Sequence, residues 1–452
     1  MTEQQVDTGS WGGAPGIAAT SYPSDVGLLV ELRASWPPER PAAAGDRTDE
    51  RGYAAADLAG TTLAAAIRLG DRHAVGLLLV GDGAYVVAPL VRDEILVTAW
   101  RQARPGDGLS AFVAGVPTAS ERAIEADQTN ASVVVGERAV VKWFRRVGPG
   151  PSRAAPLLAH LDALGFRAMP QPLGSLSWRS TAGGELVLAQ GDAFLAGARD
   201  GWDWVVERLA SHVAHGAACP AGCDPWVGRL LGRLVAELHA ALATPSGIIA
   251  TPRMEAPPAL VGEWRDRARA TLAEAIELTA ADDEIAAAAL ARLAPGMRTT
   301  IDRMTTGRGV PTQPVHGDLH VGQVLEWSGG LAVIDFDGNP ALDAGANALR
   351  QPVERDLAQM LSSLDHVGRV VAHQLAEPEG RAALDPDREN AIEGWIVRTR
   401  REFLGAVGGA PDPALLAAFE IEQECRELVY AARFLKRWRH APLATLRARY
   451  VG

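Results

Sequence analysis

Apolar residues along this chain follow two different spacings. Before about residue 195 they form short, partly β-branched runs separated by Gly and Asp, as in Ala74–Val80, the turn Gly81–Gly83 and Ala84–Ala88. This pattern is typical of a β-hairpin. From about Trp202 onward, apolar residues recur every three or four positions, as in Trp226–His239, which predicts helices with one buried face. The chain is therefore expected to be β-rich first and helical afterwards.

The same two patterns locate the remaining elements. Strands are expected at 131–135, 139–143 and 185–190, and one helix at 154–164. The later part is expected to be helical at 226–239, 258–293, 354–364, 387–405 and 413–438, with one hairpin at 323–336. Together these elements predict an α+β chain of four segments: a flexible N-terminus 1–24, a β-rich cap 25–115, a β-rich lobe 116–195 and a mostly helical lobe 196–452.

The hairpin carries the most informative candidate chemistry. Its lead-in contains Asp318 and, five positions later, Gln323, and an apolar run after the turn ends at Asp335. Carboxylate and amide oxygens are ligands that suit Mg2+, and a further carboxylate can orient a hydroxyl for phosphoryl transfer. An unpaired carboxylate at the end of so apolar a strand is unfavourable, so Asp335 is expected to hold the metal. The pattern predicts a small-molecule kinase; the alternative role for Asp318 is capping of a turn.

Length and charge narrow the class of protein. A chain of 452 residues suggests roughly three structural units. The net charge of −11 disfavours a nucleic-acid binder, which needs a basic face. No apolar run approaches the ~20 residues of a membrane span, and Met1–Ser24 lacks the regions of a signal peptide. The expectation is a cytoplasmic protein, monomeric or homodimeric, with small-molecule ligands.

One group of metal-ligating residue types has two interpretations. His212, His215, Cys219 and Cys223 are close in sequence, and four such ligands could hold zinc. Their spacing does not match the common structural zinc patterns, so a helix end followed by a turn with two unrelated histidines is favoured. A disulfide between the two cysteines would be unusual in a reducing cytosol.

Lysine is nearly absent from the chain. Only Lys142 and Lys436 occur, so the other 42 of the 44 basic residues are arginines. A lysine retained within Ala139–Trp143 indicates a need for a compact ammonium group, with chance as the alternative.

Several short motifs occur together in one order: Gln128–Ser132, Val140–Lys142, Asp200–Trp202, Leu231–His239, His316–Asp318, Ile334–Phe336 and Arg355–Ala358. By these motifs the chain resembles the aminoglycoside-phosphotransferase and maltokinase branch of the protein-kinase-like fold, and its pattern is most similar to actinobacterial glucosamine kinases and maltokinases. The resemblance covers about residues 25–445 and implies a bilobal kinase-like fold with an N-terminal cap, using ATP and Mg2+.

The resemblance implies roles for individual residues. Asp318 matches the catalytic aspartate that accepts the proton of a sugar hydroxyl. Gln323 and Asp335 match the Mg2+ ligands, and Asp337 either joins the metal or hydrogen-bonds around it. Lys142 is expected at the α- and β-phosphates of ATP. The other implied ATP-binding residues are Gln128, Thr129, Asn130, Ala131 and Ser132 over the phosphates, and Gln190 and Asp192 near the adenine.

The acceptor is expected between Asp318 and the C-terminal helices. A segment that resembles the sugar-binding part of maltokinases contains Glu424, Glu427 and Trp438, and His320 is placed to assist, with stabilisation of its turn as the alternative. Acids suit a cationic amino group, and an aromatic ring can stack on a sugar. The alternative is a solvated acidic helix face, although the polar residues form one helical stripe: Glu420, Gln423, Glu424, Glu427 and Tyr430.

Two departures from the family pattern leave alternatives open. Phe434–Trp438 differs from the maltokinase sequence, which favours glucosamine, phosphorylated by ATP to glucosamine 6-phosphate, over maltose, phosphorylated to maltose 1-phosphate, or an aminoglycoside. In this fold a helix glutamate usually fixes the lysine, yet no acid occurs between Trp143 and Asp162. A non-catalytic sugar or nucleotide sensor is therefore a further alternative.

Overall fold

The computed structural model divides the chain into two compact units. One unit consists of Met1–Ala159 with Pro170–Ala196, and the other of His160–Met169 with Gly197–Gly452. The boundaries expected near residues 24 and 115 lie outside the described residues, so the division of the first part into cap and lobe stays a prediction. The structure describes residues 30–34, 62–69, 73–79, 85–89, 96–100, 121–124, 130–144, 146–147, 152–179, 185–215, 226–304, 309–339, 350–376 and 384–450.

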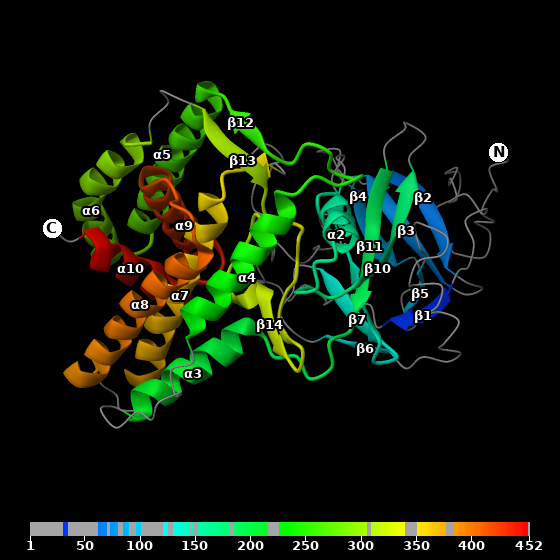
Figure 1. The fold of residues 1–452 in the computed structure, drawn as a ribbon, viewed down its shortest axis with the longest axis horizontal. Helices are drawn as coiled ribbons and strands as arrows, with labels where there is room; N and C mark the ends of the chain where they lie inside the picture. The colour runs from blue at the N-terminus through cyan, green and yellow to red at the C-terminus, as the bar shows by residue number, and fades with distance from the viewer. Residues whose placement is uncertain are drawn as a thin grey trace. The chain divides into compact units, whose positions relative to one another are not determined.

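The first unit is built from antiparallel sheets (Figure 1). The hairpin expected around Gly81–Gly83 is confirmed, because β3 pairs with β4 and places Leu79 opposite Tyr85. The sheets are β1 (Val30–Ala34) with β5 (Leu96–Trp100); β2 (Thr62–Leu69), β3 (His73–Leu79), β4 (Tyr85–Pro89) and β9 (Arg146–Val147); and β10 (Pro172–Arg179), β11 (Glu185–Ala193), β8 (Ala139–Trp143), β7 (Ala131–Val135) and β6 (Glu121–Ala123).

The second unit is mostly helical, as the sequence predicts (Figure 1). Its central helix is α7, which packs against α3, α8, α9 and α10. Every residue of α7 from Glu354 to Gly368 is buried, including its polar ones. The helices are α3 (Gly201–His215), α4 (Val227–Leu242), α5 (Pro258–Ala280), α6 (Glu284–Asp302), α7 (Glu354–Ala376), α8 (Pro386–Val407), α9 (Pro413–Arg433) and α10 (His440–Tyr450); α2 (Ala154–Ala163) crosses the boundary of the two units.

Two expected helical stretches are divided in the structure. The stretch 258–293 breaks after Ala280, because the Asp283 side chain accepts from the Ala286 N–H and begins the separate helix α6. The stretch 413–438 ends at Arg433. After it, Phe434 and Leu435 leave helical geometry and a short 3-10 turn, η6 (Lys436–Arg439), follows. The sequence lacks a proline or glycine at either break, so the apolar spacing alone did not reveal them.

Short strands of the second unit flank the loop that contains Asp318. β13 (Val310–Pro314) pairs with β12 (Met254–Ala256) and β16 (Arg350–Gln351), and leads into the loop that contains Asp318. The predicted hairpin is confirmed as β14 (Val324–Trp327) and β15 (Gly330–Val333), preceded by a 3-10 turn, η4 (Val321–Gln323). None of the described helices has the length and apolar composition needed to cross a membrane.

Candidate active site

The backbone of the loop before Asp318 is fixed by one buried carboxylate. Asp356, in the first turn of α7, accepts from the N–H groups of His316 and Gly317, both at 2.8 Å, and contacts His239 Nε2 at 2.9 Å. Gly317 has φ +86°, a conformation that favours glycine. Burial alone would raise the pKa of Asp356, but these partners lower it. The Arg355–Ala358 motif thus supports the loop that contains Asp318.

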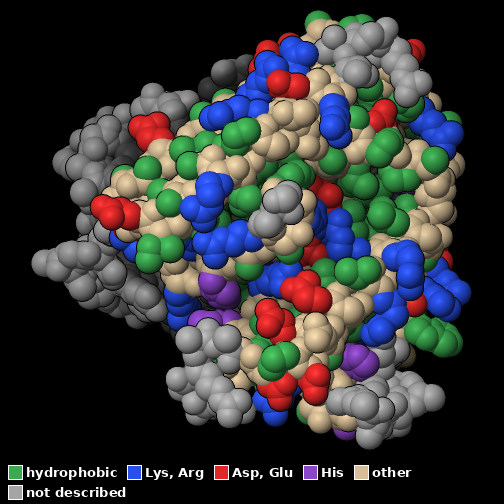
Figure 2. Space-filling model, turned by 90° about the vertical axis from the view of Figure 1, so that its left-hand side faces the viewer, with side chains coloured by type: hydrophobic (Ala, Val, Ile, Leu, Met, Phe, Trp, Pro, Cys, Tyr) green, Lys and Arg blue, Asp and Glu red, His purple; other side chains and the backbone are tan. Residues whose placement is uncertain are grey.

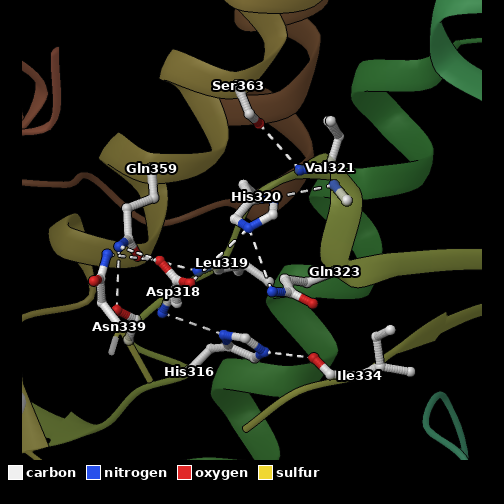
Figure 3. A network of polar contacts seen from close by, with 12 residues as sticks. His316, Asp318, Leu319, His320, Val321, Gln323, Ile334, Asn339, Gln359 and Ser363 are labelled. Atoms are coloured by element: carbon white, nitrogen blue, oxygen red, sulfur yellow. Dashed lines mark hydrogen bonds and ion pairs between the residues drawn. The ribbon is translucent and has the colours of Figure 1, made fainter. Parts of the chain in front are cut away.

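Two further residues of α7 continue this support (Figure 3). Gln359 accepts from Leu319 N–H at 3.1 Å and donates to the Gly317 carbonyl at 3.1 Å. Ser363 accepts from Val321 N–H at 3.1 Å. Asp356, Gln359 and Ser363 follow helical spacing, so one stripe of α7 binds the loop from 316 to 321. Sequence reasoning missed the last two, although polar residues at this spacing in an apolar helix are a detectable signal.

The Asp318 side chain is held by two amides. Its Oδ1 accepts from Asn339 Nδ2 at 3.0 Å and from Gln359 Nε2 at 3.5 Å, while Oδ2 lies 4.0 Å from His320 Nε2. Burial raises the pKa of Asp318, and the nearby charge of Asp335 raises it further, against the opposing effect of His320. The carboxylate, whose side chain is 19% exposed, is therefore oriented and a stronger base than a fully exposed one.

Gln323 and Asp335 lie on adjacent arms of the hairpin. Ile334 N–H donates to the Gln323 carbonyl at 2.9 Å, which places Asp335 one residue beyond the backbone partner of Gln323. Gln323 Nε2 contacts His320 Nε2 at 3.3 Å, so its Oε1 points away from His320 (Figure 3). An amide oxygen and a carboxylate on neighbouring arms of one hairpin fit Mg2+, which prefers oxygen ligands.

Two details differ from the expectation at these positions. Asp335 is exposed, not enclosed by the apolar strand that precedes it. Its backbone has φ +64°, so the chain turns out of the sheet at this residue and carries the carboxylate to the surface. His320 caps the turn η4, with its Nδ1 accepting from Gly322 N–H at 3.2 Å. The turn-stabilising alternative for His320 is therefore observed.

In the first unit, the described ATP-binding candidates lie on neighbouring strands. Lys142 on β8 is opposite Ser132 on β7 and opposite Gln190 on β11. Gln190 is buried, and its Nε2 donates to Asp192 Oδ1 at 3.3 Å. The strand register thus places Ser132, Lys142 and Gln190 side by side across three strands, although they are up to 58 positions apart in sequence. Ala131 is the first residue of β7 and Asn130 directly precedes it, whereas Gln128 and Thr129 lie outside the described residues.

The acceptor candidates form a cluster in the second unit. Trp438 Nε1 donates to Glu427 Oε2 at 2.8 Å, and the buried Glu424 Oε2 contacts His366 Nε2 at 2.8 Å. The Trp438 ring centroid lies 5.4 Å from that of His366 and 5.8 Å from that of Trp202. Sequence reasoning missed His366 and gave Trp202 no role, because both come from other helices and only the fold brings them to Trp438.

The charge state of this cluster depends on burial. Burial alone would lower the pKa of His366, but the Glu424 charge and hydrogen bond raise it. Burial raises the pKa of Glu424, and its second oxygen, Oε1, is buried without a hydrogen-bond partner. An unpaired buried acceptor is unfavourable unless a donor reaches it.

Of the other members of the expected stripe, Gln423 joins this cluster, since its Nε2 donates to Glu427 Oε1 at 2.9 Å, whereas Glu420 and Tyr430 do not. Glu420 pairs with Arg400 Nη2 at 2.6 Å and with Arg449 Nη1 at 2.8 Å. The rings of Tyr430 and Phe434 are in tilted contact, with centroids 5.4 Å apart. The stripe is therefore divided between a structural ion network and the cluster around Glu424 and Glu427, since different helices pack against successive turns of α9.

The zinc interpretation receives no support from the described residues. Among them, no group of three or more His, Cys, Asp or Glu side chains is arranged to hold a metal ion. His212 and His215 lie in the last turn of α3, and Cys219 and Cys223 lie outside the described residues.

Comparison with known proteins defines the class. The chain belongs to the phosphotransferase enzyme family APH, whose model matches residues 120–386. It is 38% identical over 421 residues to a glucosamine kinase of Streptacidiphilus jiangxiensis, covering 84% of this chain and 89% of the relative. It is 35% identical over 395 residues to a glucosamine kinase of Mycolicibacterium smegmatis, covering 82% and 94%.

A solved structure extends this similarity to the fold. A glucosamine kinase in complex with glucosamine, ADP and inorganic phosphate matches with a TM-score of 0.68 and 35% identity, over 86% of this chain and 94% of the other. The resemblance to the phosphotransferase family and the α+β kinase-like fold expected from the sequence are both confirmed.

Proposed function

We propose that this protein is a glucosamine kinase that transfers the γ-phosphoryl group of ATP to the 6-hydroxyl of glucosamine. The two curated relatives and the matching solved structure, which are 35–38% identical to this chain over the aligned residues, support the substrate class. The observation that carries the assignment is the orientation of Asp318 by Asn339 and Gln359, on a loop whose backbone α7 binds along its length.

Asp318 acts as the base of the transfer. Its carboxylate accepts a hydrogen bond from the sugar hydroxyl and takes the proton while the new O–P bond forms and the bond to ADP breaks. The raised pKa of Asp318, caused by burial, makes it a better proton acceptor than an exposed carboxylate. The residues Asn339 and Gln359 keep Oδ1 occupied, which leaves Oδ2 for the acceptor.

Gln323 and Asp335 would hold Mg2+ through oxygen atoms. When bound, the ion neutralises the charge of the ATP phosphates. In the other unit, Lys142 would bind the α- and β-phosphates, with Gln128–Ser132 covering them and Gln190 and Asp192 near the adenine. The described α2 has no acid in its first turn, so the glutamate that usually pairs with this lysine is not supplied there.

The acceptor would be bound by Glu424, Glu427 and Trp438, with His320 beside Asp318. The buried Glu424 Oε1, which has no hydrogen-bond partner, favours a ligand with a cationic amino group over a neutral disaccharide. The Trp438 ring, fixed through Nε1 by Glu427, offers an apolar face for the sugar ring. A cytoplasmic location and a monomeric or homodimeric state stay predictions.

An acceptor screen tests this function. ATP consumption would be measured with glucosamine, glucose, maltose and an aminoglycoside, with an acceptor-free reaction as the control. We expect the kcat/KM for glucosamine to exceed that for glucose by on the order of 10-fold or more, since loss of an ion-paired amino group leaves Glu424 unmatched. A preference for maltose or an aminoglycoside would replace the proposed acceptor. Binding without any phosphoryl transfer would support the sensor alternative.

A further inference from the structure

The turn that carries Trp438 is attached to the corner between α5 and α6. Arg439 Nη1 lies 3.2 Å from Asp283 Oδ2, and Arg439 Nη2 also pairs with Asp282. Lys436 pairs with the same Asp282 carboxylate. The two basic residues of η6 that make these pairs thus meet two adjacent acids at the start of α6.

The ion-paired residues of η6 and its tryptophan lie on different sides of the turn. A 3-10 helix has three residues per turn, so Lys436 and Arg439 lie on one side of η6 and Trp438 lies on another. The first side faces Asp282 and Asp283, whereas the indole of Trp438 contacts Glu427 and the rings of His366 and Trp202. A shift of the paired side therefore moves the indole.

Asp282 and Asp283 stay charged near neutral pH. Hydrogen bonds from Lys436 and then Arg439 lower the pKa of Asp282 to about 2. Asp283 also caps α6, and the Ala286 N–H lowers its pKa. Since protonation does not release these pairs near neutral pH, ionic strength is the variable that weakens them.

The pairs are open to screening by salt. Lys436 is 54% exposed and Asp282 is 23% exposed, so mobile ions reach both. On the face turned to the viewer in Figure 2, acidic and basic side chains of the protein lie interspersed. Arg439, 9% exposed, is the more enclosed member of the group.

We propose that Asp282 and Asp283 are positioning residues that set the affinity for the acceptor, by holding the Lys436–Arg439 turn so that Trp438 meets Glu427 and His366. This inference rests on the proposed function, in which Trp438 contacts the sugar. It also gives a role to Lys436, the only lysine besides Lys142. A lysine suits this position because one compact ammonium group binds a shared carboxylate without a bidentate geometry.

The test is the salt dependence of the Michaelis constants. For the unchanged protein, we expect the KM for glucosamine to rise about threefold between low salt and 0.5 M NaCl, while the KM for ATP changes less. The double variant Asp282→Asn, Asp283→Asn should start at a KM for glucosamine on the order of fivefold higher, and this KM should rise less with salt, because only the direct screening of the sugar amine remains. Its kcat should stay within about twofold.

Three further variants make the result decisive. Asp302→Asn removes an exposed pair with Arg269 on the same α5–α6 hairpin, away from η6, and should behave like the unchanged protein. Asp282→Glu should restore most of the affinity, since it keeps the charge. Lys436→Gln tests the same contact from the other side if the double variant folds poorly, because Lys436 is exposed.

The inference is overturned if the KM for glucosamine and its salt dependence are the same in the double variant, or in Lys436→Gln, as in Asp302→Asn. That outcome differs from failure of the proposed function, in which the unchanged protein itself does not phosphorylate glucosamine.

Discussion

The surroundings of Asp318 have two opposing effects on its carboxylate. Its hydrogen bonds from Asn339 and Gln359 orient the carboxylate, but its burial disfavours the charged form that a base requires. A carboxyl whose pKa is raised in the folded state stabilises the fold at low pH and loses this contribution as pH rises through the folded pKa. The catalytic group is therefore expected to weaken the fold at neutral pH.

Asp318→Asn tests both consequences. We expect kcat to fall by about 10²–10⁴-fold because the base is lost. We also expect Tm at pH 7.5 to rise by about 1–3 °C, because the buried charge is removed while an amide oxygen can still accept from Asn339. The gain in Tm should disappear as pH falls toward about 4, where the unfolded carboxyl also protonates. Activity retained by the variant would remove Asp318 from its role.

Glu422 shows the opposite behaviour. Its Oε1 accepts from Arg267 Nε at 2.9 Å and its Oε2 from Arg355 Nη2 at 3.2 Å, all within the packing of α5, α7 and α9. Burial alone would raise the pKa of Glu422, but Arg355, Arg426 and Arg267 lower it to about 2. Its stabilising contribution is thus present above the unfolded pKa near ~4.5 and is lost as pH falls through about 2.

Glu422→Gln should lower the free energy of unfolding at pH 7 by about 3 kcal/mol, because buried arginines lose their counter-charge. Urea denaturation measures this, and the difference from the unchanged protein should shrink between about pH 4.5 and pH 2. The exposed Glu277 on α5 provides the matched control, since Glu277→Gln should change stability by less than ~0.5 kcal/mol. Equal stabilities of the two variants would contradict the structural role of Glu422.

At the scale of elements, the N-terminus of α3 packs closely against the β14–β15 hairpin and the turn η4 that precedes it. Gly201 begins α3 and lies so close to η4 and β14 that a Cβ atom would overlap the carbonyl oxygens of Val321 and Val324. Trp204 on the same helix donates from Nε1 to the Val324 carbonyl at 3.2 Å. Helix α3 can therefore approach the hairpin only through a glycine.

Gly201→Ala should displace α3 and the hairpin from each other. We expect a loss of about 2–3 kcal/mol of stability, since backbone atoms have to shift, and a fall in kcat larger than any change in KM for ATP. Gly296→Ala is the control, because its Cβ would meet no atom within 4 Å in helix α6 and alanine favours the helix. A Tm for Gly201→Ala that matches the control would show that the close approach is not required.

The sequence predicted helices and strands correctly where the spacing of apolar residues reflects one buried face of the element. The β14–β15 hairpin followed from apolar runs around a Gly–Gly turn, and the helices of the second unit followed from three- and four-residue spacing. It failed where tertiary contacts decide. The sequence showed no sign that the chain turns at Asp335 with a positive φ, or that Glu420 pairs with Arg400 and Arg449.

At the scale of the whole molecule, the candidate sites draw on distant segments. In the second unit, the cluster of acceptor candidates combines Trp202, His366, Glu424 and Trp438 from α3, α7, α9 and η6. The resemblance to a kinase family predicts an acceptor role for Glu424, Glu427 and Trp438, which the fold brings together. It could not indicate His366, because no local pattern distinguishes a histidine that faces Glu424 from one that faces another side of a buried helix.

The most direct test of the central claim is product analysis of glucosamine incubated with the protein, ATP and Mg2+. Phosphorus NMR should show a new sugar phosphate whose coupling places the phosphoryl group on the 6-hydroxyl, with one ADP formed for each sugar phosphate. The same reaction with Asp318→Asn should yield at least about 10²-fold less product in the same time. No sugar phosphate from the unchanged protein, or equal yields from both proteins, would contradict the account.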